Sequence, residues 1–555
     1  MDAVYTNAKI TTSDAARPFA DTVVVENGRF TYVGDRAGAP PAPELTVHDL
    51  GGRRVLPGLI DAHTHPEKLT LSRWHVQLPP TDDLDEVLDF IAEYALSHPR
   101  EEAPFLYFEY YSNAIFGEGA PTREILDRVV NDRPVLCQDF SDHASWVNTR
   151  MLELLGVTRD TPDPTPGLEV FVRDENGAPT GHVLELAYLH FVERVWKAIG
   201  WHPPVATPDT LSVFFERLRG WGVTAVFEAY VEDEATVAAV AELDRTGGLG
   251  LHYEGAVRFR SRADVDEAVS TVRRYQQTYG SERVRFRTVK IFLDGTNEMG
   301  SGAVLQPLVD GTHGEMEVGT EELAACLMIL NDAGIDAHIH LVGDRAFRSA
   351  CDAVQAAREE LGAAWRMRVT LAHCELVDPS DMPRPADLGV MVNWTPHWSG
   401  GYFGEGARDH LGDERWNRMY DFTDIADAGA TLTFGSDVVT ASEENRADPF
   451  LGMQAALTRV DPEFPLDPAR FPASVRPREE ARIALERLIQ GYTIDAARQL
   501  RLEDRIGSIA PGKLADFVVL SEDLFDVPPD AVGSIDPLAV FIEGEIVSGS
   551  LIETR

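Results

Sequence analysis

The feature of this chain that most restricts its fold is a repeated alternation of short apolar strands and amphipathic helices through the middle of the sequence. Strand-like segments occur at 224–230, 285–295, 335–343, 367–375, 389–396 and 430–437. Helix-like segments such as TEELAACLMILNDAG and DRAFRSACDAVQAAREELG separate them. Repeated strand-then-helix units place the strands parallel, and eight such units close into a barrel. We therefore predict an α/β protein built on a (β/α)8 TIM barrel.

Both ends of the chain consist of short strands divided by tight turns. Residues 1–57 contain strand-like runs broken by Asn-Gly and Gly-Gly turns, and the last part of the chain contains ADFVVLSEDLF and AVFIEGEIVSG. Neither end holds enough strands to bury a core by itself, and chain termini often lie close together. We therefore predict one small β-sandwich domain formed by residues 1–57 and 497–555, beside a barrel of residues 58–496.

A long insert interrupts the predicted barrel after its first strand, over about residues 67–185. Near its start, TDDLDEVLDFIAEYALS, residues 81–97, has apolar residues at helical spacing after an Asp/Thr cap signal. We expect the insert to be an α/β segment.

The apolar run VLPGLI, followed by DAHTHP, ends a predicted strand in two histidines. Because side chains alternate along a strand, His63 and His65 point to the same side. They form half of a metal site, although two packed or solvent-facing histidines would give the same pattern. Other predicted strands end in further candidates, namely Lys290, His340, His373 and Asp437. Barrel enzymes hold their active sites at these strand ends, so we predict a catalytic site with one or two divalent ions, zinc being the first expectation.

Lys290 and Asp437 each allow two interpretations. An ammonium group does not bind a cation, so Lys290 either pairs with an acidic neighbour such as Asp294 or is converted by CO2 to a carbamate that bridges two metals. Asp437 either caps a helix or contacts the metal and takes the proton of a bound water. In the second case, a metal-activated hydroxide attacks the substrate, and Asp437 serves as general base and then as general acid.

Composition excludes several classes of partner. The chain has 50 Lys plus Arg against 91 Asp plus Glu, a net charge of −41 that would repel nucleic acid and anionic membranes. This charge suits neutral or cationic substrates, or simply solubility. Four cysteines without framework spacing favour a reducing cytosol, the first residues do not resemble a signal peptide, and no apolar run approaches a membrane span. We expect a cytoplasmic enzyme with a small-molecule substrate, and homo-oligomerisation is left open.

On these motifs the chain resembles the amidohydrolase superfamily, and within it the family-3-type amidohydrolases that include N-substituted formamide deformylase. PGLIDAHTHP is similar to the first-strand metal motif, VKIFLDGT to the segment with the bridging lysine, and FGSD to the segment with the catalytic aspartate. HLVGDRA resembles a motif that places a ligand at His340 rather than at His338, and LAHCE supplies His373. IGSIAPGKLADFVVL is similar to the superfamily's C-terminal β-domain signature. The resemblance implies a metal-dependent hydrolase of a C–N amide bond.

Two segments supply the predicted substrate contacts. RPVLCQDFSDHASWVNTRMLELLGV, in the insert, resembles the family's segment with a histidine near the substrate, here His143. The aromatic-rich NWTPHWSGGYFG contains Trp394, His397 and Trp398, which either line an apolar pocket at the barrel mouth or pack a loop against a helix. Glu375 shares a strand face with His373, and its role is open.

The resemblance leaves alternatives for the reaction. The favoured substrate is an N-substituted formamide or a related amide. The alternative is a deaminase or cyclic amidohydrolase acting on a heterocycle, which we disfavour because no glutamate follows His340 closely and Lys290 is present. A non-catalytic scaffold is the remote alternative, since all the matched positions retain ligand chemistry.

Overall fold

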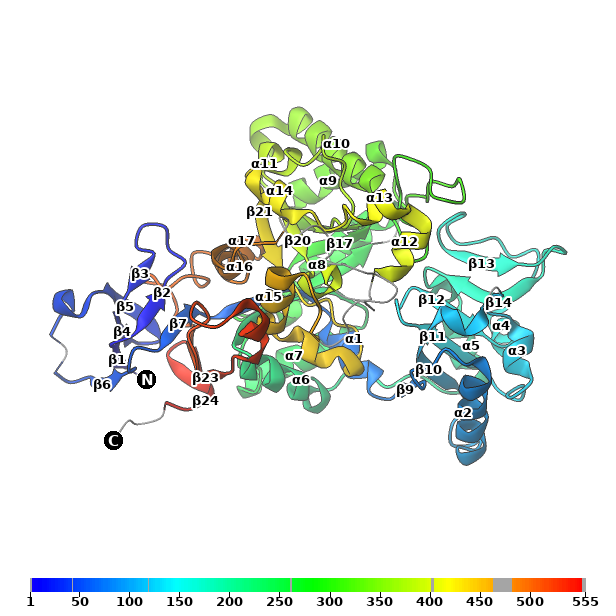
Figure 1. Ribbon diagram of the computed structural model, residues 1–555, viewed down its shortest axis with the longest axis horizontal. Helices are drawn as coiled ribbons and strands as arrows, with labels where there is room; N and C mark the ends of the chain where they lie inside the picture. The colour runs from blue at the N-terminus through cyan, green and yellow to red at the C-terminus, as the bar shows by residue number, and fades with distance from the viewer. Residues whose placement is uncertain are drawn as a thin grey trace.

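A sheet of eight parallel strands forms the centre of the molecule (Figure 1). The computed structural model describes residues 2–41, 43–117, 119–259, 262–400, 404–462 and 482–551. The barrel strands are β8 (Leu59–Thr64), β15 (Val223–Val231), β16 (His252–Phe259), β17 (Val284–Phe292), β18 (Asp336–Leu341), β19 (Val369–His373), β20 (Met391–Trp394) and β21 (Thr431–Phe434). They follow chain order around the sheet. Beyond β21, the N–H of Asp437 donates to the carbonyl of His63 at 2.8 Å and brings the last strand back to the first. The predicted TIM barrel is confirmed.

Most of these strands could be recognised in the sequence as apolar runs, because both of their faces are buried. All nine residues of β15 are buried, as expected for a parallel strand with helices outside and a filled barrel inside. β16 was not predicted, because its run HYEGAVRF contains His252, Glu254 and Arg258 and does not read as an apolar strand. The barrel interior accepts these polar side chains, which a local pattern cannot indicate.

Amphipathic helices cover the outside of the barrel. The helices after the barrel strands are α6 (Pro208–Gly220), α7 (Glu234–Thr246), α8 (Val265–Tyr279), α9 (Thr320–Ala333), α10 (Asp344–Leu361), α11 (Arg384–Leu388), α14 (Phe422–Asp427), α16 (Leu485–Gly491) and α17 (Ile494–Gln499). Between them lie α12 (Glu405–Leu411), α13 (Asp413–Trp416) and α15 (Pro449–Thr458). In α8, the buried residues Val265, Ala268, Val269, Val272 and Tyr275 recur at helical spacing and form the stripe that packs inward.

Strands from the two ends of the chain share one sheet. In this six-stranded sheet, β7 (Arg54–Pro57) pairs antiparallel with β22 (Phe517–Leu520) and parallel with β2 (Lys9–Thr11). The other members are β3 (Phe19–Ala20), β23 (Pro537–Ile542) and β24 (Glu545–Gly549). A second sheet contains β5 (Arg29–Gly34), β4 (Thr22–Glu26), β1 (Ala3–Thr6) and β6 (Thr46–Asp49). Residues from both ends form one buried cluster, in which the Phe517 and Phe541 rings stack at 4.1 Å.

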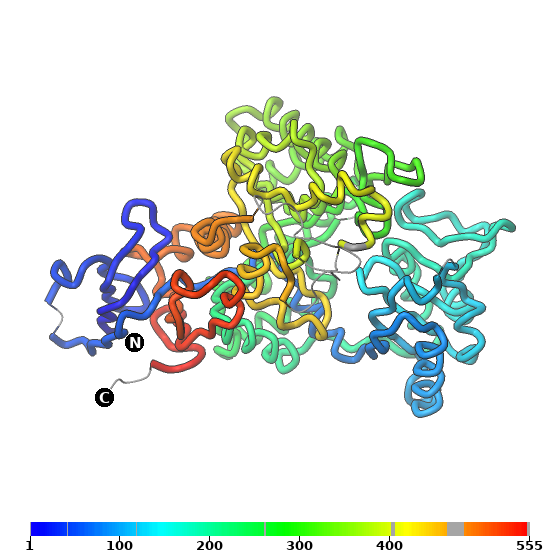
Figure 2. The backbone as a smooth tube through the Cα atoms, in the orientation of Figure 1, coloured from blue at the N-terminus to red at the C-terminus, as the bar shows by residue number. Residues whose placement is uncertain are grey.

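The insert forms a separate mixed sheet at the other side of the barrel (Figure 2). Its strands are β9 (Val76–Gln77), β10 (Leu106–Tyr111), β11 (Val135–Asp139), β12 (Ala144–Val147), β13 (Val170–Arg173) and β14 (Pro179–Leu184). Its helices are α2 (Leu84–Ser97), α3 (Arg123–Asp127), α4 (Thr149–Leu155) and α5 (Val192–Ile199). The cap of α2 is Asp83, which accepts from the N–H groups of Asp85 and Glu86.

The insert ends later than the sequence suggested. The chain leaves β8 through the short helix α1 (Pro66–Ser72), and α5 packs on the insert after residue 185. The barrel resumes only at α6, which begins at Pro208. The apolar face of α5 gives no local sign of the sheet against which it packs, so its assignment required the tertiary structure.

Candidate active site

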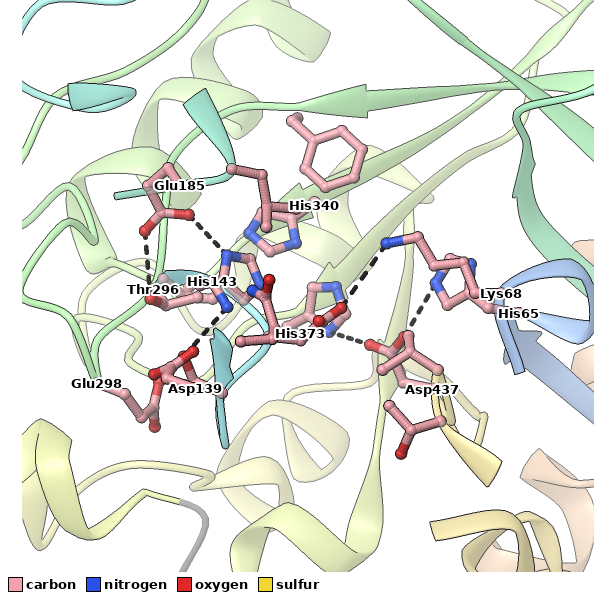
Figure 3. A pocket seen from close by; sticks show the side chains of 18 of the residues that line it. His65, Lys68, Asp139, His143, Glu185, Thr296, Glu298, His340, His373 and Asp437 are labelled. Atoms are coloured by element: carbon pink, nitrogen blue, oxygen red, sulfur yellow. Dashed lines mark hydrogen bonds and ion pairs between the residues drawn. The ribbon is translucent and has the colours of Figure 1, made fainter. Parts of the chain in front are cut away.

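Three histidines surround the carboxylate of Asp437 at the C-terminal mouth of the barrel. Figure 3 labels two of them, His65 and His373, beside Asp437. Nε2 of His65 lies 3.1 Å and Nε2 of His63 lies 3.5 Å from Oδ1 of Asp437. Nδ1 of His373 lies 3.4 Å from Oδ2. These side chains come from the ends of β8, β19 and β21, and the barrel brings them together although they are far apart in the sequence.

Lys290 and His340 complete the predicted set. Nζ of Lys290, on β17, lies 3.2 Å from Nε2 of His63. Burial lowers the pKa of Lys290 to about 7, and the charges of Arg258 and Lys68 act in the same direction. His340, on β18, has its ring centroid 4.6 Å from that of His373, and its Nε2 lies 3.0 Å from the carbonyl oxygen of Gly295. All six predicted residues line one cavity.

Two residues outside the predicted ligand set, His338 and Asp61, hold these side chains in place. Nε2 of His338 lies 3.0 Å from Nδ1 of His63, on the side of the ring away from Asp437. Asp61 accepts from the N–H of Ser436 at 3.0 Å and from its hydroxyl at 2.6 Å, and from the N–H of His63 at 3.3 Å. Asp61 therefore joins the end of β8 to the loop that carries Asp437. The sequence did offer a sign of both residues. Asp61 lies two positions before His63 on β8, and His338 lies two positions before His340 on β18, so each shares a strand face with a predicted ligand.

His143 lies at the far side of the same cavity, on the turn between β11 and β12 of the insert. Its Nδ1 lies 2.6 Å from Oε2 of Glu185, which follows β14. Burial alone would lower the pKa of His143, but the charge of Glu185 and its hydrogen bond raise it to about 9. The His143 ring lies 6.3 Å from that of His340, so the insert contributes a cationic group close to the predicted ligands.

The aromatic segment contributes one of its three predicted contacts. Trp398 lines the cavity and stacks on the His373 ring at 5.2 Å. Trp394 does not line it, since it is fully buried and stacks on Phe422 at 4.0 Å beneath α14. His397 is also buried outside the cavity, beside Arg446 and Tyr492. Residues 401–403 of this segment lie outside the described residues. An aromatic composition does not reveal which rings face the barrel mouth.

The predicted ligands fit a divalent metal ion by their chemistry. His63, His65 and Asp437 each offer a ligand atom within 4.8 Å of the others. Burial lowers the pKa of His63 and of His373 well below the usual histidine range, so their imidazoles are neutral, as metal ligands must be. Imidazole and carboxylate together suit zinc and related ions. The space that these residues line measures about 1350 Å³, which includes open solvent at its mouth.

Comparison with known proteins agrees with this geometry. Residues 46–548 match the model of the amidohydrolase family. The chain belongs to this family. N-substituted formamide deformylase of Arthrobacter pascens is 28% identical over 575 residues, covering 98% of this chain and 97% of that protein. Protein LONG AFTER FAR-RED 3 of Arabidopsis thaliana is 26% identical over 561 residues, covering 98% and 91%.

Solved structures show the same fold. An uncharacterized metal-dependent hydrolase from Pyrococcus horikoshii OT3 superposes with a TM-score of 0.67 at 23% identity, over 95% of this chain and 99% of that chain. The predicted family membership is confirmed, and this amidohydrolase is a hydrolytic enzyme. Among its described helices, none has the length and apolar character needed to cross a membrane.

Proposed function

We propose that this amidohydrolase hydrolyses the C–N bond of a small-molecule amide, with one or two divalent metal ions, zinc being the expected ion. The residues that would hold the metal are His63, His65, Lys290, His340, His373 and Asp437. The observation that carries the proposal is the convergence of three imidazoles on the Asp437 carboxylate, with Lys290 adjacent, inside a buried cavity.

The environment of Lys290 supports carboxylation of its amine. Only a neutral amine attacks CO2, forming a carbamate and releasing a proton. Burial lowers the pKa of Lys290 to about 7, so a substantial neutral fraction exists near neutral pH. The resulting carbamate would carry a negative charge and two oxygens, which the amine lacks.

Asp437 is the proposed general base and acid. A bound metal ion supplies Lewis-acid polarisation of the amide carbonyl and increases the acidity of water. Asp437 accepts the proton of the attacking water and delivers it to the leaving nitrogen. Burial would raise the pKa of Asp437, but the hydrogen bond from His65 brings it below its usual value. The carboxylate is therefore ionised at neutral pH and available as a base. His143 and Trp398 contact the substrate in this proposal.

The Lys290→Ala variant tests the carbamate. We expect it to lose bound metal, measured by elemental analysis of the purified protein, together with hydrolysis of a panel of N-substituted formamides and acetamides. Formate or acetate should restore part of both by replacing the carbamate oxygens. The matched control is Lys197→Ala, which removes an exposed lysine of α5.

Two results would contradict the proposal. Full metal occupancy in K290A would make Lys290 an ion-pairing residue only. Ammonia release from an aminated heterocycle, without hydrolysis of any amide in the panel, would favour the deaminase alternative.

A further inference from the structure

Arg258 is a half-buried arginine at the barrel mouth, and its guanidinium contacts aromatic rings. It is on β16, lines the cavity, and stands in register with Lys290 on the neighbouring strand β17. Its guanidinium contacts aromatic faces, 4.3 Å from the Phe292 centroid and 5.7 Å from that of Tyr230. Its Nε is buried without a hydrogen-bond partner. Within the described part of the chain, none of its nitrogens has a carboxylate within ion-pair distance.

A buried arginine of the same protein shows the ordinary arrangement. Arg133 donates to the carbonyl oxygens of His98, Ala103 and Ala95 at 2.6, 2.9 and 2.6 Å. A guanidinium has five N–H donors, and leaving them unsatisfied away from water is costly. Because Arg258 is half-buried, with a shielded Nε and its side chain at the cavity, water or a ligand in the cavity supplies its remaining acceptors.

A second cation stands beside it. Nζ of Lys68, in the first turn of α1, lies over the same Tyr230 ring at 5.3 Å. The closest carboxylate oxygen that pairs with Lys68 is 3.8 Å away, on Asp142. Lys290 also contacts the ring that holds Arg258, with Nζ 5.1 Å from the Phe292 centroid. Arg258 and Lys68 are therefore two cationic side chains on one wall of the cavity, around the same Tyr230 ring.

Two carboxylates of the same cavity contact neighbours within the protein. Glu169 accepts from Thr165 at 2.7 Å and pairs with His190 at 2.8 Å. Glu109 lies 2.5 Å from His75. Both carboxylates therefore make their short contacts to groups other than Arg258.

We propose that Arg258, with Lys68 beside it, is a binding subsite for a carboxylate of the substrate. The planar fork of a guanidinium matches a carboxylate in a bidentate pair. The proximity of Lys290 through the Phe292 ring places this carboxylate a few bonds from the reacting amide. The substrate class is therefore an amide that carries a carboxylate close to the scissile bond, such as an N-acyl amino acid. This inference rests on the proposed amide hydrolysis and specifies its substrate.

The test uses matched substrate pairs with the metal-loaded enzyme. N-formyl- and N-acetyl-DL-phenylalanine carry the carboxylate, and N-formyl- and N-acetyl-2-phenylethylamine are the same amides without it. We expect the wild type to favour the carboxylate member by at least tenfold in kcat/KM. R258M should reduce that ratio by about 10- to 100-fold, mainly through KM, as expected for loss of hydrogen bonds to a charged group.

Two further variants separate recognition from a folding defect. R258K retains the charge without the fork, so it should give an intermediate ratio. R274M removes an arginine that lies over the Tyr275 ring at 4.7 Å, outside the cavity lining, and should leave the ratio unchanged. An equal loss for both members of each pair in R258M, or a wild-type preference for the neutral members, would overturn the subsite.

Failure of the proposed hydrolysis itself has a different signature. If the wild type cleaves neither member, amide hydrolysis of these compounds is refuted, and the subsite is judged by calorimetric titration with 3-phenylpropanoate and 3-phenylpropan-1-ol. At least tenfold weaker binding of the carboxylate to R258M than to the wild type, with the alcohol unaffected, supports the subsite. Equal affinity of both proteins for the carboxylate places it elsewhere, for example on the metal, and overturns the subsite.

Discussion

His373 and Asp437 hold backbone conformations that most residues avoid. Their φ angles are +72° and +50°, in the left-handed region that favours glycine. Such conformations cost about 1–3 kcal/mol each and persist where the surroundings impose them. At Asp437 the constraint is visible, because Asp61 binds the preceding Ser436 and the N–H of Asp437 donates to His63. Strain at these two positions aims their side chains at each other.

Replacing Asp437 with asparagine removes the proton acceptor while keeping the size and shape of the side chain. Asparagine tolerates positive φ and has the size of aspartate, so the fold should persist. Loss of the proton acceptor should lower kcat by about 10²–10⁴-fold, the usual value of general acid–base help. Steady-state kinetics and the unfolding temperature measure the two effects, with the exposed Asp424→Asn as control. His143 variants should change KM more than D437N does. Near-wild-type turnover of D437N would assign the base to another group, Glu375 first.

His338 should set the orientation of His63. For Nε2 of His63 to offer its lone pair to a metal, Nδ1 must carry the proton and donate it to Nε2 of His338, 3.0 Å away. His338→Phe keeps the bulk and removes this acceptor, so metal affinity should fall about 10- to 100-fold. Competition with a chelator measures it, and His182→Phe in β14 is the control. Unchanged affinity would mean that His338 only packs against Phe227, at 4.9 Å.

At the scale of elements, the insert is attached to the barrel by polar contacts at the cavity. The turn between β11 and β12 carries His143, and the residue after β14 is Glu185. Glu185 binds His143 within the insert and accepts from Thr296, at 3.3 Å, and from Ser301 in the loop that follows β17. One carboxylate thus joins two sheets where they enclose the cavity. The same carboxylate raises the pKa of His143 to about 9, which favours an ion pair between them at neutral pH.

This pair predicts a pH dependence of stability. Glu185 raises the pKa of His143 from its ordinary 6.5 to about 9, so its stabilisation is fully present below about pH 6.5 and is lost as the pH rises through 9. The unfolding temperature of the wild type should exceed that of H143Q most at pH 6, and the difference should shrink towards pH 10. His202→Gln, at an exposed position, is the control. A difference that does not vary with pH would show that His143 is not charged in the folded protein.

At the scale of the whole molecule, the two chain ends depend on each other. Tyr5 and Phe541 lie at opposite ends of the sequence, yet their rings meet at 5.3 Å in an edge-to-face arrangement. Both are buried in the same cluster. The predicted composite domain of residues 1–57 and 497–555 accounts for this contact, because neither end alone supplies the strands of the shared sheet.

A double-mutant cycle tests that dependence. F541A should lower the free energy of unfolding by about 3–5 kcal/mol, the usual cost of deleting a buried phenylalanine. Y5A and F541A should couple by about 0.5–1.5 kcal/mol, as contacting aromatic rings do. Y5A combined with F214A, in the barrel helix α6, should be additive within about 0.5 kcal/mol. Additivity of Y5A with F541A, measured by denaturant unfolding, would refute a shared core.

The pattern of neighbouring residues in the sequence was enough to predict much of the fold and the type of chemistry at the strand ends. Strand period and apolar runs predicted the barrel, and strand alternation placed His63 and His65 on one side. Family resemblance chose His340 over His338, and in the structure His340 lines the cavity whereas His338 lies behind His63. The sequence did not decide between two outcomes where a local pattern allows both: β16 is a barrel strand that carries His252, Glu254 and Arg258, and Trp394 and His397 are buried outside the cavity.

What the sequence by itself determined is therefore the kind of element and the kind of ligand at each strand end, since both depend on neighbouring residues. Only the tertiary structure decided which of those ends meet and what lies between them. The approach of His63 to Asp437, the contact of Glu185 with Thr296, and the unpaired guanidinium of Arg258 all depend on closure of the barrel and on the docking of the insert. Distances between residues remote in the chain are set by packing, and no periodicity within a segment encodes them.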